Sequence, residues 1–268
     1  MFLNEQNENR MTVGIISYNI HCVPVVGGCP TGHLNAVAAY VNRLATDNDA
    51  SILVLNELFV KDARAVLLKR LREGGVMWQM TPVANTPHVN LLASSGVAVA
   101  WRPDRVIRTG KMHEIAFKGC CQFDCLAYKG AIHVPFRTLE GHRFHVVGTH
   151  MQAWEIPMAC TGVRDGQSEQ LGNMVSALQK DGTVHPSEAV ILAGDFNENA
   201  TEGMESRLGA SHVACRGECR THASGAFDHF FVRADESFLS RCSPYTTVGV
   251  SNASNPSDHL PIFMKVDI

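Results

Sequence analysis

The chain has 268 residues, a length that suits one large domain, and no Pro/Ser/Gly-rich linker divides it. Hydrophobic residues make up 45% and charged residues 18%, which is typical of a globular protein and excludes a disordered chain. The formal net charge is -3 and the 23 lysines and arginines are scattered, which argues against a nucleic-acid partner. We therefore expect one domain over residues 12–268, behind a flexible segment at 1–11.

The sequence offers no membrane span and no export signal. No run of 18 apolar residues occurs, and the first residues, MFLNEQNENRM, are polar and acidic rather than basic and then apolar. This predicts a cytoplasmic protein by default, and a secreted one if a signal was removed ahead of this numbering. We expect a monomer.

Short apolar runs alternate along the chain with a few segments of helical periodicity. Strands are expected at 12–18, 51–57, 96–101, 131–136, 143–150, 189–195, 227–232 and 260–266. Helices are expected at 33–46, 62–73 and 163–180, where apolar residues recur at three-to-four spacing. Hairpin-like neighbours at 96–117 and 127–149 favour sheets packed together and covered by helices over a parallel doubly wound sheet, which makes the class α+β.

Polar residues that can bind metal or move protons stand at the ends of the expected strands. Apolar runs are closed at their C-terminal ends by Asn19, Glu57, His150, and Asp195 with Asn197. Other apolar runs are opened by Asp228 with His229 and by Asp258 with His259. Strands of opposite direction bring both sets to one rim, where strand-end residues commonly form sites.

Each of these residues also has an ordinary structural interpretation. Asn19 suits a turn, Glu57 a solvated strand end or a helix cap, and His150 a hydrogen-bonded core imidazole. The joint occurrence favours a site, because several independent turns would each have to choose a metal-ligating or proton-transferring side chain. Carboxylates with amide oxygens suit Mg²⁺ or Mn²⁺, and imidazoles beside such an ion suit phosphodiester hydrolysis.

The ordered motifs SYNIH, LNE, GTHMQ, GDFNEN, FDHFFV and SDHLP resemble the endonuclease/exonuclease/phosphatase superfamily. The resemblance implies a four-layer α/β/β/α sandwich of two mainly antiparallel sheets flanked by helices. Within the superfamily, FKGCCQFDCLAYKGAIHVPF at 117–136 is similar to the neutral and bacterial sphingomyelinase C branch.

The resemblance implies Mg²⁺-dependent cleavage of sphingomyelin, or of a related phospholipid, to ceramide and phosphocholine at a membrane or micelle surface. Mn²⁺ and Co²⁺ are the expected substitutes for Mg²⁺. The alternatives are a nuclease or an inositol-phosphate phosphatase on the same fold, and a catalytically silent lipid-binding module. The scattered basic residues oppose a nuclease, and the complete set of strand-end residues opposes a silent module.

The resemblance also implies a role for each strand-end residue. The implied metal ligands are Asn19, Glu57, Asp195, Asn197 and Asp258. The implied catalytic residues are His150, Asp195, Asn197, Asp228 and His259, with Asp228 orienting the His259 ring. Which histidine acts as acid and which as base stays open.

Contacts to the substrate are less clearly marked in the sequence. Lys118 and Lys129 are candidates to meet the phosphate or the lipid headgroup, and solvated loop lysines are an equal alternative. The bacterial lipid-cleaving enzymes carry an aromatic hairpin before the SDH motif, whereas Tyr245 is the only aromatic residue of CSPYTTVGVSNASNP here. Trp154, on an expected loop, is the candidate substitute for membrane contact, with a loop folded over the core as the alternative.

Nine cysteines, an odd number, leave at least one thiol unpaired within the chain, and their spacing lacks the paired CxxC pattern of a zinc site. The resemblance implies a disulfide between Cys120 and Cys160, worth roughly 2–4 kcal/mol of stability. Two free buried thiols in a reducing compartment are the alternative.

Overall fold

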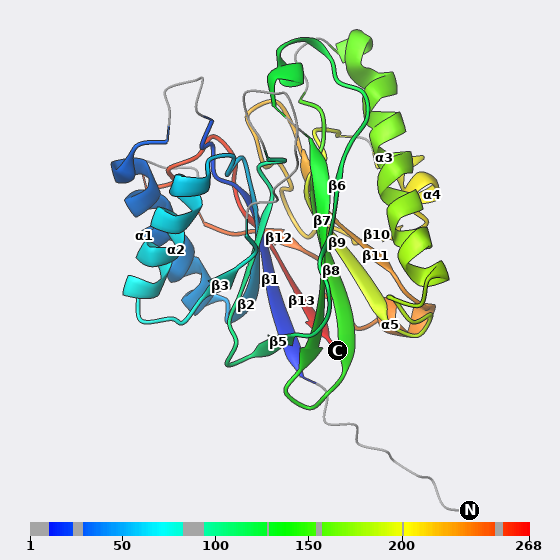
Figure 1. Cartoon of the computed structure of the whole chain (residues 1–268), viewed down its shortest axis with the longest axis horizontal. Helices are drawn as coiled ribbons and strands as arrows, with labels where there is room; N and C mark the ends of the chain where they lie inside the picture. The colour runs from blue at the N-terminus through cyan, green and yellow to red at the C-terminus, as the bar shows by residue number, and fades with distance from the viewer. Residues whose placement is uncertain are drawn as a thin grey trace, which may run out of the picture.

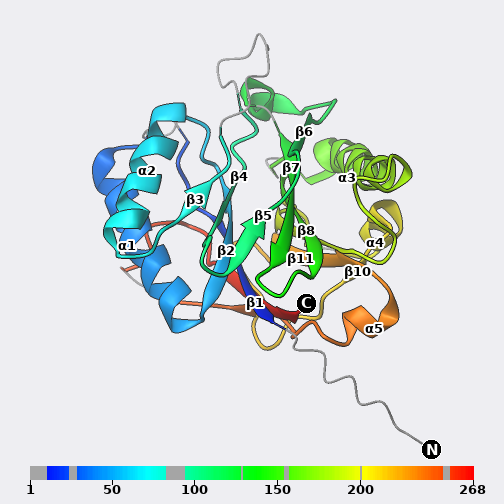
Figure 2. The same ribbon diagram turned by 60° about the horizontal axis from the view of Figure 1, so that its bottom comes forward.

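The computed structural model describes residues 11–23, 29–82, 94–127, 129–153, 157–199, 201–249 and 254–268. Two sheets pack face to face between helices on both outer sides (Figure 2). The α+β sandwich expected from the sequence is therefore confirmed. Most of the segment predicted to be flexible, residues 1–10, lies outside this description.

The first sheet has the strand order β12-β13-β1-β2-β4-β3. Its strands are β1 (Thr12–Asn19), β2 (Ala50–Asn56), β3 (Gln79–Met80), β4 (Ala98–Trp101), β12 (Thr246–Thr247) and β13 (Ile262–Asp267). β1 runs parallel to β2 and antiparallel to β13. The ends of β1 and β2 therefore share one rim with the start of β13.

The second sheet has the order β10-β11-β9-β8-β7-β5, and β6 also pairs with β7. Its strands are β5 (Val106–Arg108), β6 (His113–Ala116), β7 (Gly130–Thr138), β8 (Arg143–His150), β9 (Ala189–Asp195), β10 (Ser211–His212) and β11 (Asp228–Arg233). β8 and β9 are parallel, while β7 and β11 run against them. The ends of β8 and β9 thus meet the starts of β7 and β11.

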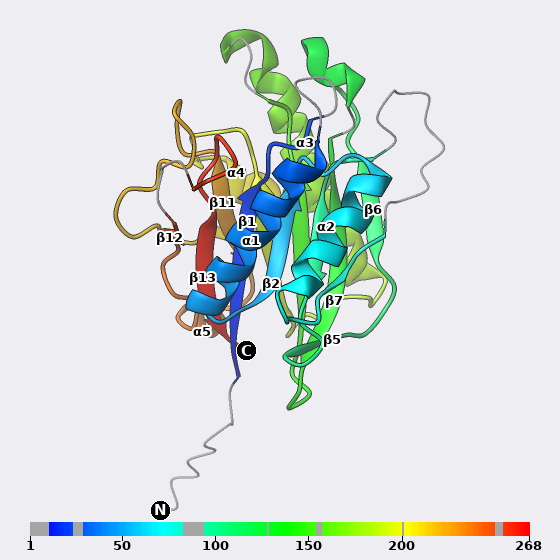
Figure 3. The same cartoon turned by 90° about the vertical axis from the view of Figure 1, so that its left-hand side faces the viewer.

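Helices cover the outer face of each sheet. The helices are α1 (Thr31–Asp47), α2 (Lys61–Glu73), α3 (Pro157–Lys180), α4 (Met204–Leu208) and α5 (Glu236–Leu239), with a 3₁₀ helix η1 at Gln122–Leu126. α1 and α2 lie side by side over the first sheet (Figure 3), and α3 covers the second sheet (Figure 1). α1 buries Leu34, Val37, Val41 and Leu44 at three-to-four spacing, which places one apolar stripe on the sheet.

The main core lies between the two sheets and follows the two-residue period of the strands. Val13 and Ile15 of β1 pack in one cluster with Val146 of β8 and Ile191 of β9. Each such side chain, fully removed from water, contributes about 1.5–3 kcal/mol. The sheets approach closely at Gly148, where a Cβ would come within 2.9 Å of Val97. The strand ends of the two sheets are therefore held next to each other.

One predicted hairpin is wrong and the other is confirmed. β7 and β8 pair antiparallel, as expected for 127–149. Within 96–117, β4 belongs to the first sheet, whereas β5 and β6 pair with β7 of the second. The nine-residue β7 offers an edge long enough for both short strands, so the chain crosses between sheets after β4 instead of folding back on it.

Candidate active site

Three of the predicted catalytic residues lie in one row across the second sheet. His150 at the end of β8 is the Cα partner of Asp195 at the end of β9, and Asp195 is the partner of Asp228 at the start of β11. Paired positions on neighbouring strands project from the same face of a sheet. All three side chains are buried, at 1% exposure or less. The register therefore concentrates two carboxylates and an imidazole on the face that meets the first sheet.

A glycine permits the turn at the end of β9. Gly194 has φ +151°, and a Cβ there would overlap the carbonyl oxygen of Thr149. Only glycine tolerates this approach of two backbones. The Gly-Asp pair of the GDFN motif thus has a steric reason, which is to deliver Asp195 at the rim.

The first sheet reaches the same rim through two asparagines. Asn19 at the end of β1 donates from Nδ2 to Oδ2 of Asp195 at 3.0 Å. Its neighbour Asn56 donates from Nδ2 to the Thr149 carbonyl oxygen at 2.7 Å. These bonds join the two sheets directly at the site, and Asn56 is a residue that the sequence analysis did not single out.

His259 and Asp228 form a hydrogen-bonded pair. His259 Nδ1 donates to Oδ2 of Asp228 at 2.8 Å, and Nε2 lies 3.8 Å from Oδ2 of Asp195. Burial by itself lowers the pKa of His259, but the Asp228 and Asp195 carboxylates outweigh it and raise that pKa to about 10. Burial and the Asp228 carboxylate raise the pKa of Asp195 to about 7. The site therefore places a cationic imidazole between two buried carboxyl groups.

His150 differs from His259 in protonation, because the Lys129 ammonium lies next to it. Lys129, which is 5% exposed, lies with Nζ 2.8 Å from Nε2 of His150. A lysine ammonium only donates, so His150 Nε2 accepts this hydrogen bond. Burial, followed by the nearby charges of Lys129 and His259, holds the pKa of His150 well below its usual value. His150 is thus a neutral imidazole, unlike His259.

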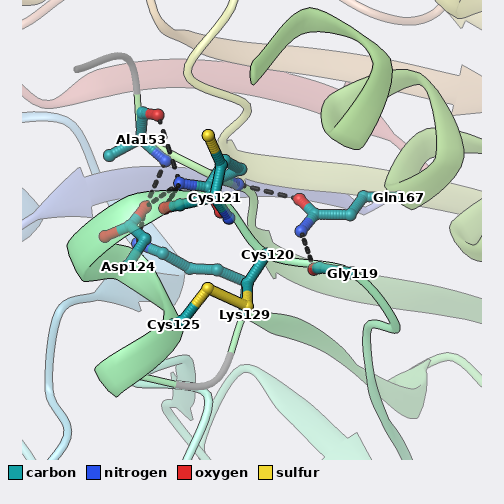
Figure 4. The surroundings of a disulfide bond; sticks show 9 residues. Gly119, Cys120, Cys121, Asp124, Cys125, Lys129, Ala153 and Gln167 are labelled. Atoms are coloured by element: carbon teal, nitrogen blue, oxygen red, sulfur yellow. Dashed lines mark hydrogen bonds and ion pairs between the residues drawn. A yellow bond between two sulfur atoms is a disulfide. The ribbon is translucent and has the colours of Figure 1, made fainter. Parts of the chain in front are cut away.

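Lys129 is held in turn by the η1 segment, which Figure 4 shows. Asp124 Oδ2 lies 3.5 Å from Lys129 Nζ and accepts hydrogen bonds from the Gln152 side chain and the Ala153 backbone. Gln152 also exchanges two hydrogen bonds with the backbone of Cys121, at 2.9 and 3.0 Å. Sequence reasoning missed Asp124 and Gln152, although both stand within motifs that it quoted.

The predicted disulfide partner of Cys120 is wrong. Cys120 is bonded to Cys125, not to Cys160 (Figure 4). The 3₁₀ turn of η1 brings the two Cα atoms to 5.1 Å, which is within the range for a disulfide. Cys22–Cys29 and Cys215–Cys219 are also bonded, and Cys242 is a free thiol. The side chain of Cys160 lies outside the described part of the structure.

The remaining predicted ligands occupy the margin of the buried row. Glu57 follows β2 directly, and its Oε2 is buried without a hydrogen-bond partner among the described residues. Asn197 is bound to the site by its backbone N–H, which donates to Asp195 Oδ1 at 2.9 Å. Asp258 is half-exposed and lies 3.6 Å from His21 and 3.8 Å from His222. Asp258 therefore stands beside the buried group and not within it.

Two predicted substrate contacts are not placed in the row. Lys118 is exposed, and its backbone exchanges hydrogen bonds with Gln170 on α3. Trp154 lies outside the described residues. No helix in the part of the chain that the structure covers is long and apolar enough to cross a bilayer.

The donor set fits a hard divalent cation. Oxygen atoms of Asp195 and Asp228 and a ring nitrogen of His259 lie within 4.8 Å of one another. With His259 protonated, the two carboxylates are the atoms of this group that can bind a cation. Asp228 Oδ1 and Glu57 Oε2 are buried oxygens without a hydrogen-bond partner among the described groups. A buried carboxylate oxygen without a partner is costly unless a cation or water compensates it. Carboxylate and amide oxygens are the ligands that Mg²⁺ prefers.

A family comparison accounts for this arrangement. The profile of the Endonuclease/Exonuclease/phosphatase family matches residues 16–259. The chain belongs to this family. It is a hydrolase of the family with a buried cluster of two aspartates and a histidine.

The chain is similar to curated bacterial proteins in sequence and to solved structures in fold. Sphingomyelinase C 2 of Leptospira interrogans (serogroup Icterohaemorrhagiae, serovar Lai, strain 56601) is 26% identical over 223 residues, which cover 75% of this chain and 34% of that protein. The chain thus spans about a third of the length of the curated relative. A mutant of beta toxin from Staphylococcus aureus with bound magnesium ions superposes with a TM-score of 0.74 at 19% identity, covering 95% of this chain and 99% of that one. Sphingomyelinase C from Streptomyces griseocarneus gives 0.74 at 17% identity, covering 96% and 99%. These structures share the fold.

Proposed function

We propose that this chain is a Mg²⁺-dependent phosphodiesterase that hydrolyses sphingomyelin, or a related phospholipid, to ceramide and phosphocholine. The observation that carries the proposal is the buried row His150, Asp195 and Asp228, completed by His259 from the loop before β13. The named relatives support the lipid substrate, because Sphingomyelinase C 2 of Leptospira interrogans matches three quarters of the chain.

The charged and polar side chains of the site have different roles in hydrolysis. Bound by the oxygens of Glu57, Asn19 and Asp195, Mg²⁺ would neutralise phosphate oxygens and lower the barrier to attack by water. The Asp195 carboxylate, held by Asn19 and by the Asn197 backbone, is placed to accept a proton from that water. His259 presents Nε2–H to the phosphate, because Asp228 occupies its Nδ1.

Lys129, held by His150, supplies hydrogen-bond donors on a second side of the site. The Lys129 ammonium bonds His150 and lies between it and Asp124, at the start of β7. It is positioned to stabilise charge on the phosphoryl oxygens or on the leaving oxygen. This assigns positive charge to His259 and Lys129, and it leaves His150 as a neutral group that orients the lysine.

A nuclease or an inositol-phosphate phosphatase on the same fold is the alternative function. Both act on highly anionic substrates and need basic side chains gathered around the site. The described site brings Lys129 to the buried row, while Lys118 is exposed outside it. One buried lysine beside the His259 imidazolium suits one phosphodiester better than a polyanion.

The direct test is phosphocholine release from sphingomyelin in mixed micelles with Mg²⁺, with EDTA and the Glu57→Gln variant as controls. Phosphatidylcholine, plasmid DNA and an inositol polyphosphate are assayed in parallel. We expect metal-dependent release from sphingomyelin and none from DNA. Cleavage of DNA or of the polyphosphate alone would keep the fold and the site but overturn the lipid substrate.

A further inference from the structure

A pocket of about 480 Å³ opens beside the candidate active site. It lies between the segment around Glu218–Ala223 and the segment around Asn255–Leu260. Asp258 lines it and is the chain neighbour of His259, and the rings of His222 and His259 lie 5.0 Å apart. A group attached to a phosphate at His259 would therefore reach this pocket.

The pocket is anchored to the strand that carries Asp228. Thr221 Oγ1 accepts hydrogen bonds from the backbone N–H groups of Phe227 and Asp228, at 3.0 and 3.3 Å. The Leu260 N–H donates to the Thr221 carbonyl oxygen at 2.6 Å. Because these bonds fix Thr221 to both walls, the pocket keeps a constant position relative to the Asp228–His259 pair.

Glu218 is fixed at the mouth of the pocket by two constraints. Its carbonyl oxygen accepts a hydrogen bond from Thr247 Oγ1 at 3.2 Å, and the Cys215–Cys219 disulfide closes the turn that contains it. The side chain is exposed and lines the pocket. Glu218 thus carries an exposed carboxylate on a backbone of fixed position.

The lining has the wrong chemistry for a quaternary ammonium. Among the described lining residues, only Ala223 and Leu260 are apolar, and the only ring is that of His222. That ring is already stacked on Phe227, with centroids 5.5 Å apart and planes 26° apart. Trimethylammonium groups are recognised by aromatic cages, and they have no N–H to donate. The pocket offers no such cage within the described residues.

The same lining suits a cation that donates hydrogen bonds. Glu218 and Asp258 contribute two carboxylates against the one guanidinium of Arg220. Thr221, Asn255 and Ser257 add neutral polar side chains. A primary ammonium donates three hydrogen bonds and carries the complementary charge. A neutral polyol would not balance the excess negative charge.

We propose that this pocket receives the headgroup of the scissile phosphodiester and selects a primary ammonium, as in a phosphoethanolamine ester, over the trimethylammonium of choline. The inference rests on the proposed function and specifies its substrate. Glu218 is the residue that sets the preference, since Asp258 is shared with His21 and His222. The lost charge-assisted hydrogen bonds would disfavour choline by roughly tenfold.

The test compares ceramide phosphoethanolamine with sphingomyelin of the same acyl chain, in identical mixed micelles with Mg²⁺. We expect kcat/KM for the ethanolamine ester to be about tenfold higher. Equal rates, or faster release of phosphocholine, would overturn the headgroup assignment while leaving the proposed function intact. If an inositol-bearing sphingolipid is the best substrate, the primary-ammonium assignment is also overturned.

A binding measurement separates the pocket from turnover. Titration calorimetry with soluble phosphoethanolamine and phosphocholine, in Mg²⁺, should give about tenfold tighter binding of phosphoethanolamine. Absence of turnover on every lipid would overturn the proposed function, and this titration would still decide the pocket's preference. Equal affinities would overturn the preference.

A matched pair of variants locates the preference. Glu218→Gln keeps the size of the side chain and removes its charge, so it should reduce the ethanolamine preference to within twofold. Glu140→Gln makes the same change in the exposed turn between β7 and β8, at the far end of the sheet, and should keep the preference. An unchanged preference in Glu218→Gln would show that the headgroup binds elsewhere.

Discussion

Three non-glycine residues next to the site have left-handed backbones. His21, Glu57 and Asn197 have φ of 49°, 63° and 52°. Such conformations are uncommon for residues other than glycine and cost of order 1–3 kcal/mol when sparsely populated, so the surrounding structure must hold them. Each lies at or just beyond the end of β1, β2 or β9. At the predicted ligands Glu57 and Asn197, the backbone therefore adopts a conformation of higher local energy that directs the side chain.

Glu57→Gln tests the metal assignment at a single atom. The change keeps shape and replaces a buried carboxylate oxygen, which has no partner among the described residues, with an amide. We expect phosphodiesterase activity to fall at least about 100-fold and Mg²⁺ binding by calorimetry to weaken, because the amide lacks the charge that balances the ion. The thermal midpoint without metal should not fall. Activity within threefold of wild type would remove Glu57 from the site.

His259→Ala tests the cationic imidazole. The variant removes the group that stands between Asp228 and Asp195, and we expect kcat to fall by about 100-fold or more. His142→Ala, in the exposed β7–β8 turn, is the control and should keep full activity. A circular-dichroism melt confirms folding of both. If His259→Ala retains activity within threefold, the phosphate is met by another residue.

At the scale of the element, η1 is the segment that positions Lys129. The segment carries Asp124 and is closed by the Cys120–Cys125 disulfide (Figure 4). The side chain of Gln152, just beyond the end of β8, donates a hydrogen bond to Asp124. Gln167 of α3 accepts from the Gln152 N–H and donates to the Gly119 carbonyl oxygen, which ties the same segment to the helix. These contacts explain why an irregular stretch can hold Lys129 against His150.

Gln152→Ala should uncouple η1 from the site. The change removes both hydrogen bonds to the Cys121 backbone and the one to Asp124, each worth about 1 kcal/mol net. We expect kcat to fall roughly tenfold with KM little changed, because Lys129 loses its fixed partner. The measurement is steady-state kinetics on micellar substrate.

Gln170→Ala is the matched control for this prediction. Gln170 clamps the Lys118 backbone by a similar pair of bonds, but at the exposed margin of the segment. It should leave kcat within twofold. Equal losses for the two variants would mean that any loosening of this segment matters, and that Gln152 has no positioning role.

At the scale of the molecule, the sequence predicted the strands that carry the site, because a polar residue that ends an apolar run is visible in the sequence. Each of the eight expected strands and three expected helices has a counterpart in the structure, and the polar residues that close apolar runs do gather at one rim. Burial on both faces makes β1 and β9 read as continuous apolar runs, so their polar ends stand out.

The other features of the fold and the site depend on contacts between residues far apart in the sequence or on local turns, and no periodic pattern predicts these. The Cys120–Cys125 bond follows from a 3₁₀ turn, and the crossing after β4 follows from the free edge of β7. Asn56 and Gln152 act through long-range hydrogen bonds to Thr149 and Asp124. Polar residues of this kind are common in sequences, and only the register of the sheets shows which of them reach the site.

A buried histidine chain on β7 and β8 should contribute to the loss of stability of the whole molecule in acid. His133 Nε2 bonds His145 Nδ1 at 2.8 Å, and His145 Nε2 bonds Glu188 Oε2 at 2.8 Å. Burial, with His145 and His113 nearby, lowers the pKa of His133 to about 3, and burial lowers the pKa of His145 despite Glu188. Arg143 pairs with the same glutamate at 3.0 Å.

The sign of the effect follows from proton binding. In the unfolded chain these histidines titrate at roughly 6.5. Between that pH and about 3, His133 therefore binds a proton in the unfolded state that it does not bind in the folded state, and the lowered pKa of His145 acts in the same direction. The free energy of unfolding should therefore fall as the pH is lowered from 6.5 toward 4.5. His133→Gln keeps an amide donor toward His145 and removes one titrating group, so its thermal midpoint should decline less steeply over that range, measured in EDTA. His142→Gln, at an exposed position, should follow wild type. Identical slopes for wild type and His133→Gln would show that acid acts on other groups, and the carboxylates of the active-site rim would then be the first to examine.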